Sequence, residues 1–95
     1  MLTISVFVAG DPPQGEDARA VKVVQAVAAR FPETVGVELL SIDGDRAEEL
    51  GLRISPSVIE GDMVLSVGEP LSAGRLKRYI EARLGEEGEP GPGGE

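Results

Sequence analysis

The 95-residue sequence contains no cysteine, no histidine and no tryptophan, and only three aromatic residues. Without cysteine the chain forms no disulfide and supplies no reactive thiol. Without cysteine and histidine it also lacks the side chains of ordinary zinc sites, of histidine-ligated haem and of Ser-His-Asp or Cys-His catalytic units. The residues that are present, 41% apolar and 27% charged, suffice for one small domain.

Charge of one sign dominates the chain. It has 9 Lys and Arg against 17 Asp and Glu, a formal net charge of −8. Such a surface repels phosphate backbones and anionic lipid, so we expect neither a nucleic-acid nor a membrane partner. The segment 85–95 holds four glutamates, no basic residue and no large apolar residue. We therefore expect a folded domain over 1–84 and a disordered acidic Gly/Pro/Glu tail over 85–95, solubilising or, alternatively, an interaction segment.

Long hydrophobic runs are also missing. The first ten residues have no basic segment followed by an uninterrupted apolar stretch, as a secretory signal would have. No part of the chain approaches the ~20 apolar residues that span a bilayer. The sequence therefore predicts a cytoplasmic protein, and the lack of cysteine is consistent with that compartment.

The apolar residues that are present follow regular periods. Alternation with β-branched enrichment predicts a strand over 2–9, and apolar positions three and four apart predict a helix over 16–31 that Pro32 ends. The segment 35–42 is apolar at most positions, which is typical of a parallel strand buried on both faces. Strand, helix and strand then form a right-handed βαβ unit.

The second half of the domain contains a hairpin between two helices. A short helix is predicted over 46–50. Strands 57–59 and 63–67 are joined by Gly61-Asp62, a pair typical of a tight primed turn. Ser72 is placed to cap a last helix. The predicted fold is α/β with the order βαβαββα, a mixed four-stranded sheet flanked by helices.

One segment and this element order together resemble the thioredoxin/glutaredoxin superfamily. Gly51-Leu-Arg-Ile-Ser-Pro-Ser-Val-Ile59, followed by Gly61 and Val67-Gly68, is similar to the family pattern Gly-Val-x-x-x-Pro-Thr at the third strand. The resemblance covers about residues 2–84. It implies a thioredoxin-like fold in which Pro56 is the family's cis-proline and Ser55 the residue before it.

The sequence departs from that family where its chemistry would be. Active members carry Cys-x-x-Cys at the start of the first helix, whereas this chain has Asp11-Pro-Pro-Gln-Gly-Glu16. The reaction needs a thiolate, so dithiol oxidoreductase activity is excluded. We expect no enzyme activity and no cofactor.

With dithiol chemistry excluded, the resemblance still implies a surface that could bind a partner. A free helix N-terminus and unpaired backbone near Ser55 would bind a protein or an extended peptide in a groove beside Pro56. The structural alternative is that Pro12-Pro13 only stiffens the start of the first helix. The candidate partner-binding residues are Asp11, Pro12, Pro13, Gln14, Ile54, Ser55, Pro56, Ser57, Val67 and Gly68. The predicted function is therefore a redox-inactive protein-binding or scaffold module.

Two alternatives belong to other classes. Val8-Ala9-Gly10 followed by Pro13 is similar to the opening of KaiB-type clock proteins, which implies a regulatory module. Alternatively, Asp11, Asp43 and Asp45 follow the two parallel strands and are candidates for a carboxylate or metal-dependent enzyme site. They lack the later ligands of a calcium loop, so we expect no metal there and interpret Asp-Gly-Asp as a turn with an aspartate helix cap.

Overall fold

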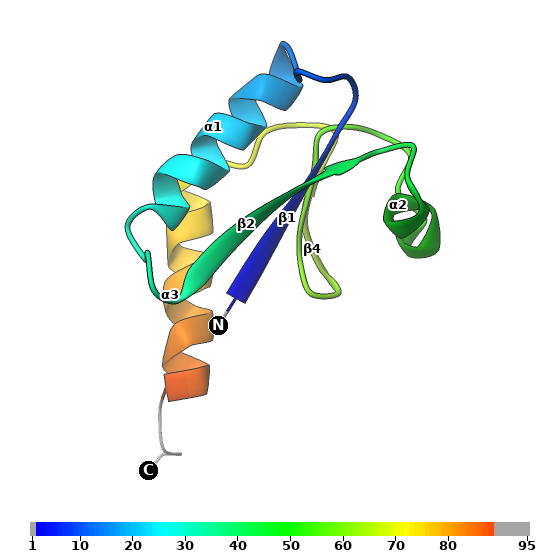
Figure 1. Ribbon diagram of the computed structural model, residues 1–95. Coiled ribbons are helices and arrows are strands. Elements are labelled where there is room, and N and C mark those ends of the chain that lie inside the picture. The colour runs from blue at the N-terminus through cyan, green and yellow to red at the C-terminus, as the bar shows by residue number, and fades with distance from the viewer. Residues whose placement is uncertain (1, 89–95) are drawn as a thin grey trace.

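The computed structural model describes residues 2–88 and forms a four-stranded sheet with three helices. The sheet order is β2-β1-β3-β4, in which β1 is parallel to β2 and antiparallel to β3, and β3 is antiparallel to β4. The predicted order βαβαββα and the mixed sheet are therefore confirmed (Figure 1). The elements are β1 (Leu2–Val8), α1 (Glu16–Ala28), β2 (Val35–Ser41), α2 (Asp45–Leu50), β3 (Ser57–Glu60), β4 (Met63–Val67) and α3 (Ala73–Gly88).

The helices lie on both faces of the sheet (Figure 1). Alternate residues of β1 point to opposite faces, so Ile4 and Val6 face α1 and α3 while Phe7 faces α2. All three side chains are fully buried. The larger core cluster also contains Val24 of α1 and Ile80 of α3. Burial of this apolar surface is the main source of stability, since the chain has no disulfide.

The predicted hairpin and last-helix cap are both present. Glu60 pairs with Met63, so Gly61 and Asp62 alone link β3 to β4. Gly61 has a φ of +61°, a backbone conformation that glycine adopts without strain. At the start of α3, the Arg75 N–H donates to Ser72 Oγ at 3.3 Å.

A buried polar cluster joins the hairpin to α3. Glu60 is only 9% exposed, and its Oε1 accepts the Tyr79 hydroxyl at 2.5 Å and Arg83 Nε at 3.0 Å. Burial raises the pKa of Glu60, but the hydrogen bonds from Tyr79 and Arg83 and the charge of Arg83 outweigh it, so the pKa is lowered. Burial, followed by the hydrogen bond to Glu60, raises the pKa of Tyr79 to about 12.

Three sequence predictions need correction. The strand β2 is an edge strand and not a strand buried on both faces, since only β1 pairs with it and Leu39 is 48% exposed. The helix α1 ends at Ala28, because the N–H groups of Arg30 and Phe31 bond the carbonyls of Val27 and Ala28 in a tighter turn. The helix α2 is capped by Gly44 without a side-chain hydrogen bond, and not by an aspartate.

The boundary of the predicted tail also differs. The helix α3 continues to Gly88, four residues beyond the expected domain end at residue 84. Glutamate favours helix, so residues 86 and 87 suit this extension. The rest of the predicted tail, residues 89–95, lies outside the described residues. Within residues 2–88, no helix combines the length and apolar character needed to cross a membrane.

Candidate functional site

Strand register brings the two predicted site segments to one edge of the sheet. Val8 at the end of β1 pairs in parallel with Ser41 at the end of β2. Phe7 pairs antiparallel with Ser57 at the start of β3. The loop from β1 to α1 and the segment before β3 therefore leave the sheet at the same edge (Figure 1).

The proline that carries the family resemblance has the expected backbone geometry. The Ser55–Pro56 peptide bond is cis, as the resemblance implies. The Asp11–Pro12 bond is also cis, which the sequence did not indicate. Pro56 and Ser57 are buried: Ser57 Oγ donates to the Ile54 carbonyl at 2.5 Å, and the Pro56 carbonyl accepts the Gly68 N–H at 2.8 Å. Pro56 and Ser57 therefore support the exposed residues around them, and their own buried side chains cannot contact a partner.

The exposed part of the predicted surface is apolar. Ile54 is 57% exposed and Val67 is 43% exposed. Gly68 has a φ of +83°, and a Cβ at this position would lie 3.3 Å from Ile54 Cγ2. Ser55 is half-buried, and its backbone N–H and C=O have no hydrogen-bond partner within residues 2–88. We call Ile54, Ser55, Val67 and Gly68 the Pro56 surface.

The loop between β1 and α1 supplies the other predicted residues. Asp11, Pro12 and Gln14 are exposed, and Pro13 is half-buried. A residue that the sequence analysis did not single out, Asp17, holds this loop: it is buried, and its Oδ2 accepts the Ala9 N–H at 2.7 Å. The sequence of the first helical turn shows that Asp17 is acidic. It does not show that Asp17 accepts the Ala9 N–H, because that contact depends on how β1 and α1 pack.

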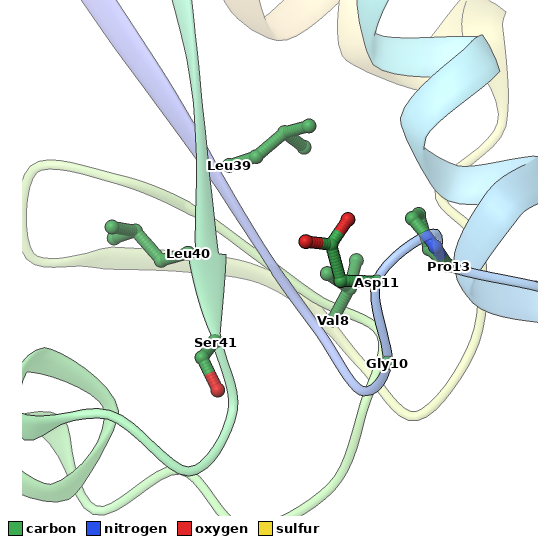
Figure 2. Close-up of a pocket in the computed structure, with 7 residues that line it drawn as sticks. All are labelled: Val8, Gly10, Asp11, Pro13, Leu39, Leu40 and Ser41. Atoms are coloured by element: carbon green, nitrogen blue, oxygen red, sulfur yellow. The ribbon is translucent and has the colours of Figure 1, made fainter.

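A pocket opens on the other side of this loop, toward β2 (Figure 2). Its volume is about 440 Å³. Asp11 and Pro13 are its only residues from the predicted set, and the sequence analysis missed Leu39, Leu40 and Ser41. The parallel pairing of β1 and β2 was the available signal, since it places the carboxyl ends of both strands together. The pocket is lined by Val8, Gly10, Asp11, Pro13, Leu39, Leu40 and Ser41.

The carboxylate alternative gains no support from the geometry. Within residues 2–88 no three or more acidic side chains gather closely enough to hold a metal ion. The Asp43 N–H donates to Ser41 Oγ at 3.1 Å, which gives this segment a structural role as a turn.

Comparison with known proteins adds the fold relationship. No protein-family model matches the chain, and no curated protein matches it in sequence. It is similar to a solved structure of thioredoxin-2, which is described as a component of the malaria parasite protein secretion machinery. The TM-score is 0.67 at 10% identity, over 86% of this chain and 82% of that chain. With the cis bond at Pro56 and no cysteine anywhere in the sequence, this chain has a thioredoxin-like fold without the residues of dithiol chemistry.

Proposed function

We propose that this chain is a redox-inactive thioredoxin-like module that binds an extended segment of a partner protein at the Pro56 surface. The observation that carries the proposal is that exposed apolar side chains and unpaired backbone groups occur together there. Ile54 and Val67 supply the apolar contact, and Ser55 supplies an N–H and a C=O that have no partner within residues 2–88. An extended peptide meets both needs, because its backbone pairs with the free groups while alternate side chains cover the apolar ones.

Exposed apolar area provides the affinity of such a contact. A partner that covers Ile54 and Val67 removes apolar surface from water, which contributes about 25 cal/mol per Å² before the costs of association. Pairing with Ser55 fixes the direction of the bound segment. The thioredoxin-like fold therefore supplies a binding surface although the chain has no thiol.

Local hydrogen bonds hold this surface in shape before a partner arrives. Ser57 Oγ bonds the Ile54 carbonyl, and the Gly68 N–H bonds the Pro56 carbonyl. Both contacts tie the segment before β3 to its surroundings. Because less backbone has to be ordered on binding, a preformed surface binds with less entropic cost.

The test compares two arginine substitutions at equally exposed apolar positions. Ile54→Arg changes the Pro56 surface, whereas Met63→Arg changes the opposite end of β4. Each purified variant is checked by circular dichroism and then used for affinity capture from a lysate of the source organism. The proposal predicts a partner retained by wild type and by Met63→Arg and lost with Ile54→Arg. A capture pattern that is unchanged by Ile54→Arg, or capture of no protein at all, contradicts it.

A further inference from the structure

One acidic side chain, the exposed Asp11, lines the pocket between the β1–α1 loop and β2. The Asp11 carboxylate makes no hydrogen bond or ion pair within residues 2–88, and no lysine or arginine lines the pocket. Figure 2 shows this carboxylate directed over the pocket toward Leu39. The formal charge of the chain, −8, adds to the negative potential of this position. A positively charged ligand group would therefore be attracted to this pocket.

The other walls of the pocket are apolar. Leu39 is 48% exposed although it lies on the face of the sheet that α1 covers, and its side chain is on the same side of β2 as Asp11 and Pro13. Leu40 points to the opposite face, where it packs against the cluster that contains Phe7, so it lines the pocket without facing Asp11. Lysine and arginine side chains combine an apolar stem with a charged end, and they bury the stem against such surfaces. The pocket therefore suits a side chain that has an apolar stem and a positively charged end.

Other ligand classes fit less well. A bound metal ion needs several oxygen ligands, whereas Asp11 is the only carboxylate in the lining. An anion would meet that carboxylate and the net negative charge of the chain. A neutral apolar group would gain no electrostatic attraction from the Asp11 carboxylate. Charge complementarity favours the basic side chain.

From these contacts we infer that the pocket binds a lysine or arginine side chain of the partner protein. The inference rests on the proposed function and specifies the partner's chemistry. The strands β2 and β3 flank β1 at a strand spacing of about 4.8 Å, so the pocket and the Pro56 surface lie roughly 10 Å apart. About three residues of extended chain span this distance. The partner segment therefore carries a basic residue about three positions from the apolar residue that covers Ile54.

The pocket is tested directly with small probes on the full chain. Nα-acetyl-lysine methylamide, Nα-acetyl-arginine methylamide and the neutral Nα-acetyl-norleucine methylamide are titrated while backbone amide resonances are followed by NMR. The inference predicts that one or both cationic probes shift Gly10, Asp11 and Ser41, and that the norleucine probe does so at least about threefold more weakly, since the ion pair is partly exposed.

Two carboxamide variants complete the test. Asp11→Asn is expected to remove the difference between the cationic and neutral probes. The matched control Asp62→Asn makes the same charge change in the turn from β3 to β4 and leaves the difference intact. Equal shifts from the norleucine probe, or cationic shifts that persist in Asp11→Asn, overturn the inference. Lysate capture through Ile54 reports separately on the proposed function, so the failure of one is distinguishable from the failure of the other.

Discussion

Two buried carboxylates hold the elements around the site in position. Asp17 fixes the start of the β1–α1 loop through the Ala9 N–H, and Glu60 joins the hairpin to α3 through Tyr79 and Arg83. A buried group that loses its partner costs more than the net contribution of an ordinary hydrogen bond. We therefore expect substitution of Asp17 or Glu60 to lower the free energy of unfolding more than substitution of an exposed acidic residue.

Replacing Asp17 with alanine tests the first of these contacts. The change leaves the part-buried Ala9 N–H without its acceptor, so we expect the free energy of unfolding to fall by about 1–3 kcal/mol. Urea denaturation measures it. The control Glu16→Ala removes a neighbouring acid that forms only an exposed ion pair with Arg19, and it should cost about 0.5 kcal/mol or less. Equal losses from the two variants would show that the Ala9 contact is not stabilising.

Tyr79 reports on the second contact, because it is the only tyrosine in the chain and there is no tryptophan. Burial and the hydrogen bond to Glu60 raise its pKa to about 12 in the folded protein, above the value of 10.0 for an ordinary tyrosine. The folded state therefore retains a proton that the unfolded state releases. This contribution to stability is complete below pH 10 and is lost as the pH rises from 10 toward 12.

Tyrosinate absorbance, followed together with circular dichroism, measures this pKa. We expect ionisation well above pH 10 in the folded protein, and ionisation closer to pH 10 in Glu60→Gln, which removes the carboxylate charge. A midpoint at pH 10 with an unchanged dichroism spectrum would show that Tyr79 is not held by Glu60.

At the scale of the elements, the sequence patterns predicted each helix and strand, the parallel pair β1–β2 and the hairpin β3–β4, but not that β2 lies at the edge of the sheet. The alternation in β1 and the turn residues Gly61 and Asp62 are local signals, and both were confirmed. The apolar run of β2 shows only that its side chains tolerate burial. Whether a strand lies at the centre or the edge of a sheet depends on pairing between distant segments, so the exposure of Leu39 could not be predicted.

The connection from β4 to α3 provides the element-scale prediction. Gly68→Ala puts a side chain at a φ of +83° and brings its Cβ within 3.3 Å of Ile54 Cγ2. We expect a loss of about 1–2 kcal/mol in the free energy of unfolding, together with amide shifts around Ile54. Gly74→Ala is the matched control: its Cβ meets nothing within 4 Å, and alanine in a helix should stabilise by up to about 1 kcal/mol. Effects of the same sign at both positions would contradict this account of the connection.

At the scale of the whole molecule, the site forms where several chain segments converge at one edge of the sheet. The family resemblance was sufficient to predict Ile54, Val67 and Gly68 as neighbours of Pro56. It did not include the pocket, whose Leu39 and Ser41 lie beside the β1–α1 loop because of the parallel β1–β2 register. The net negative charge of the chain favours basic residues in a partner segment, and the exposed apolar side chains favour apolar residues in it.

The last residues of the chain are expected to contribute charge rather than stability. Residues 89–95 contain two glutamates and no large apolar residue. A chain that ends at Gly88 should therefore melt within a few degrees of the full-length chain in a calorimetric scan, since no apolar area is lost. A large decrease in melting temperature would assign these residues to the folded domain.

Site-specific photo-crosslinking in cells of the source organism tests the central claim most directly. A photoreactive residue replaces Ile54 in one variant and Met63 in the other. The two apolar side chains have similar exposure; Ile54 lies near the end of β4, and Met63 is at the start of β4. Mass spectrometry identifies the adducts. The account predicts that a partner protein crosslinks at position 54 and not at position 63, through a segment that carries lysine or arginine near the crosslinked residue. Equal adducts at both positions, or none at position 54, would contradict a binding role for the Pro56 surface.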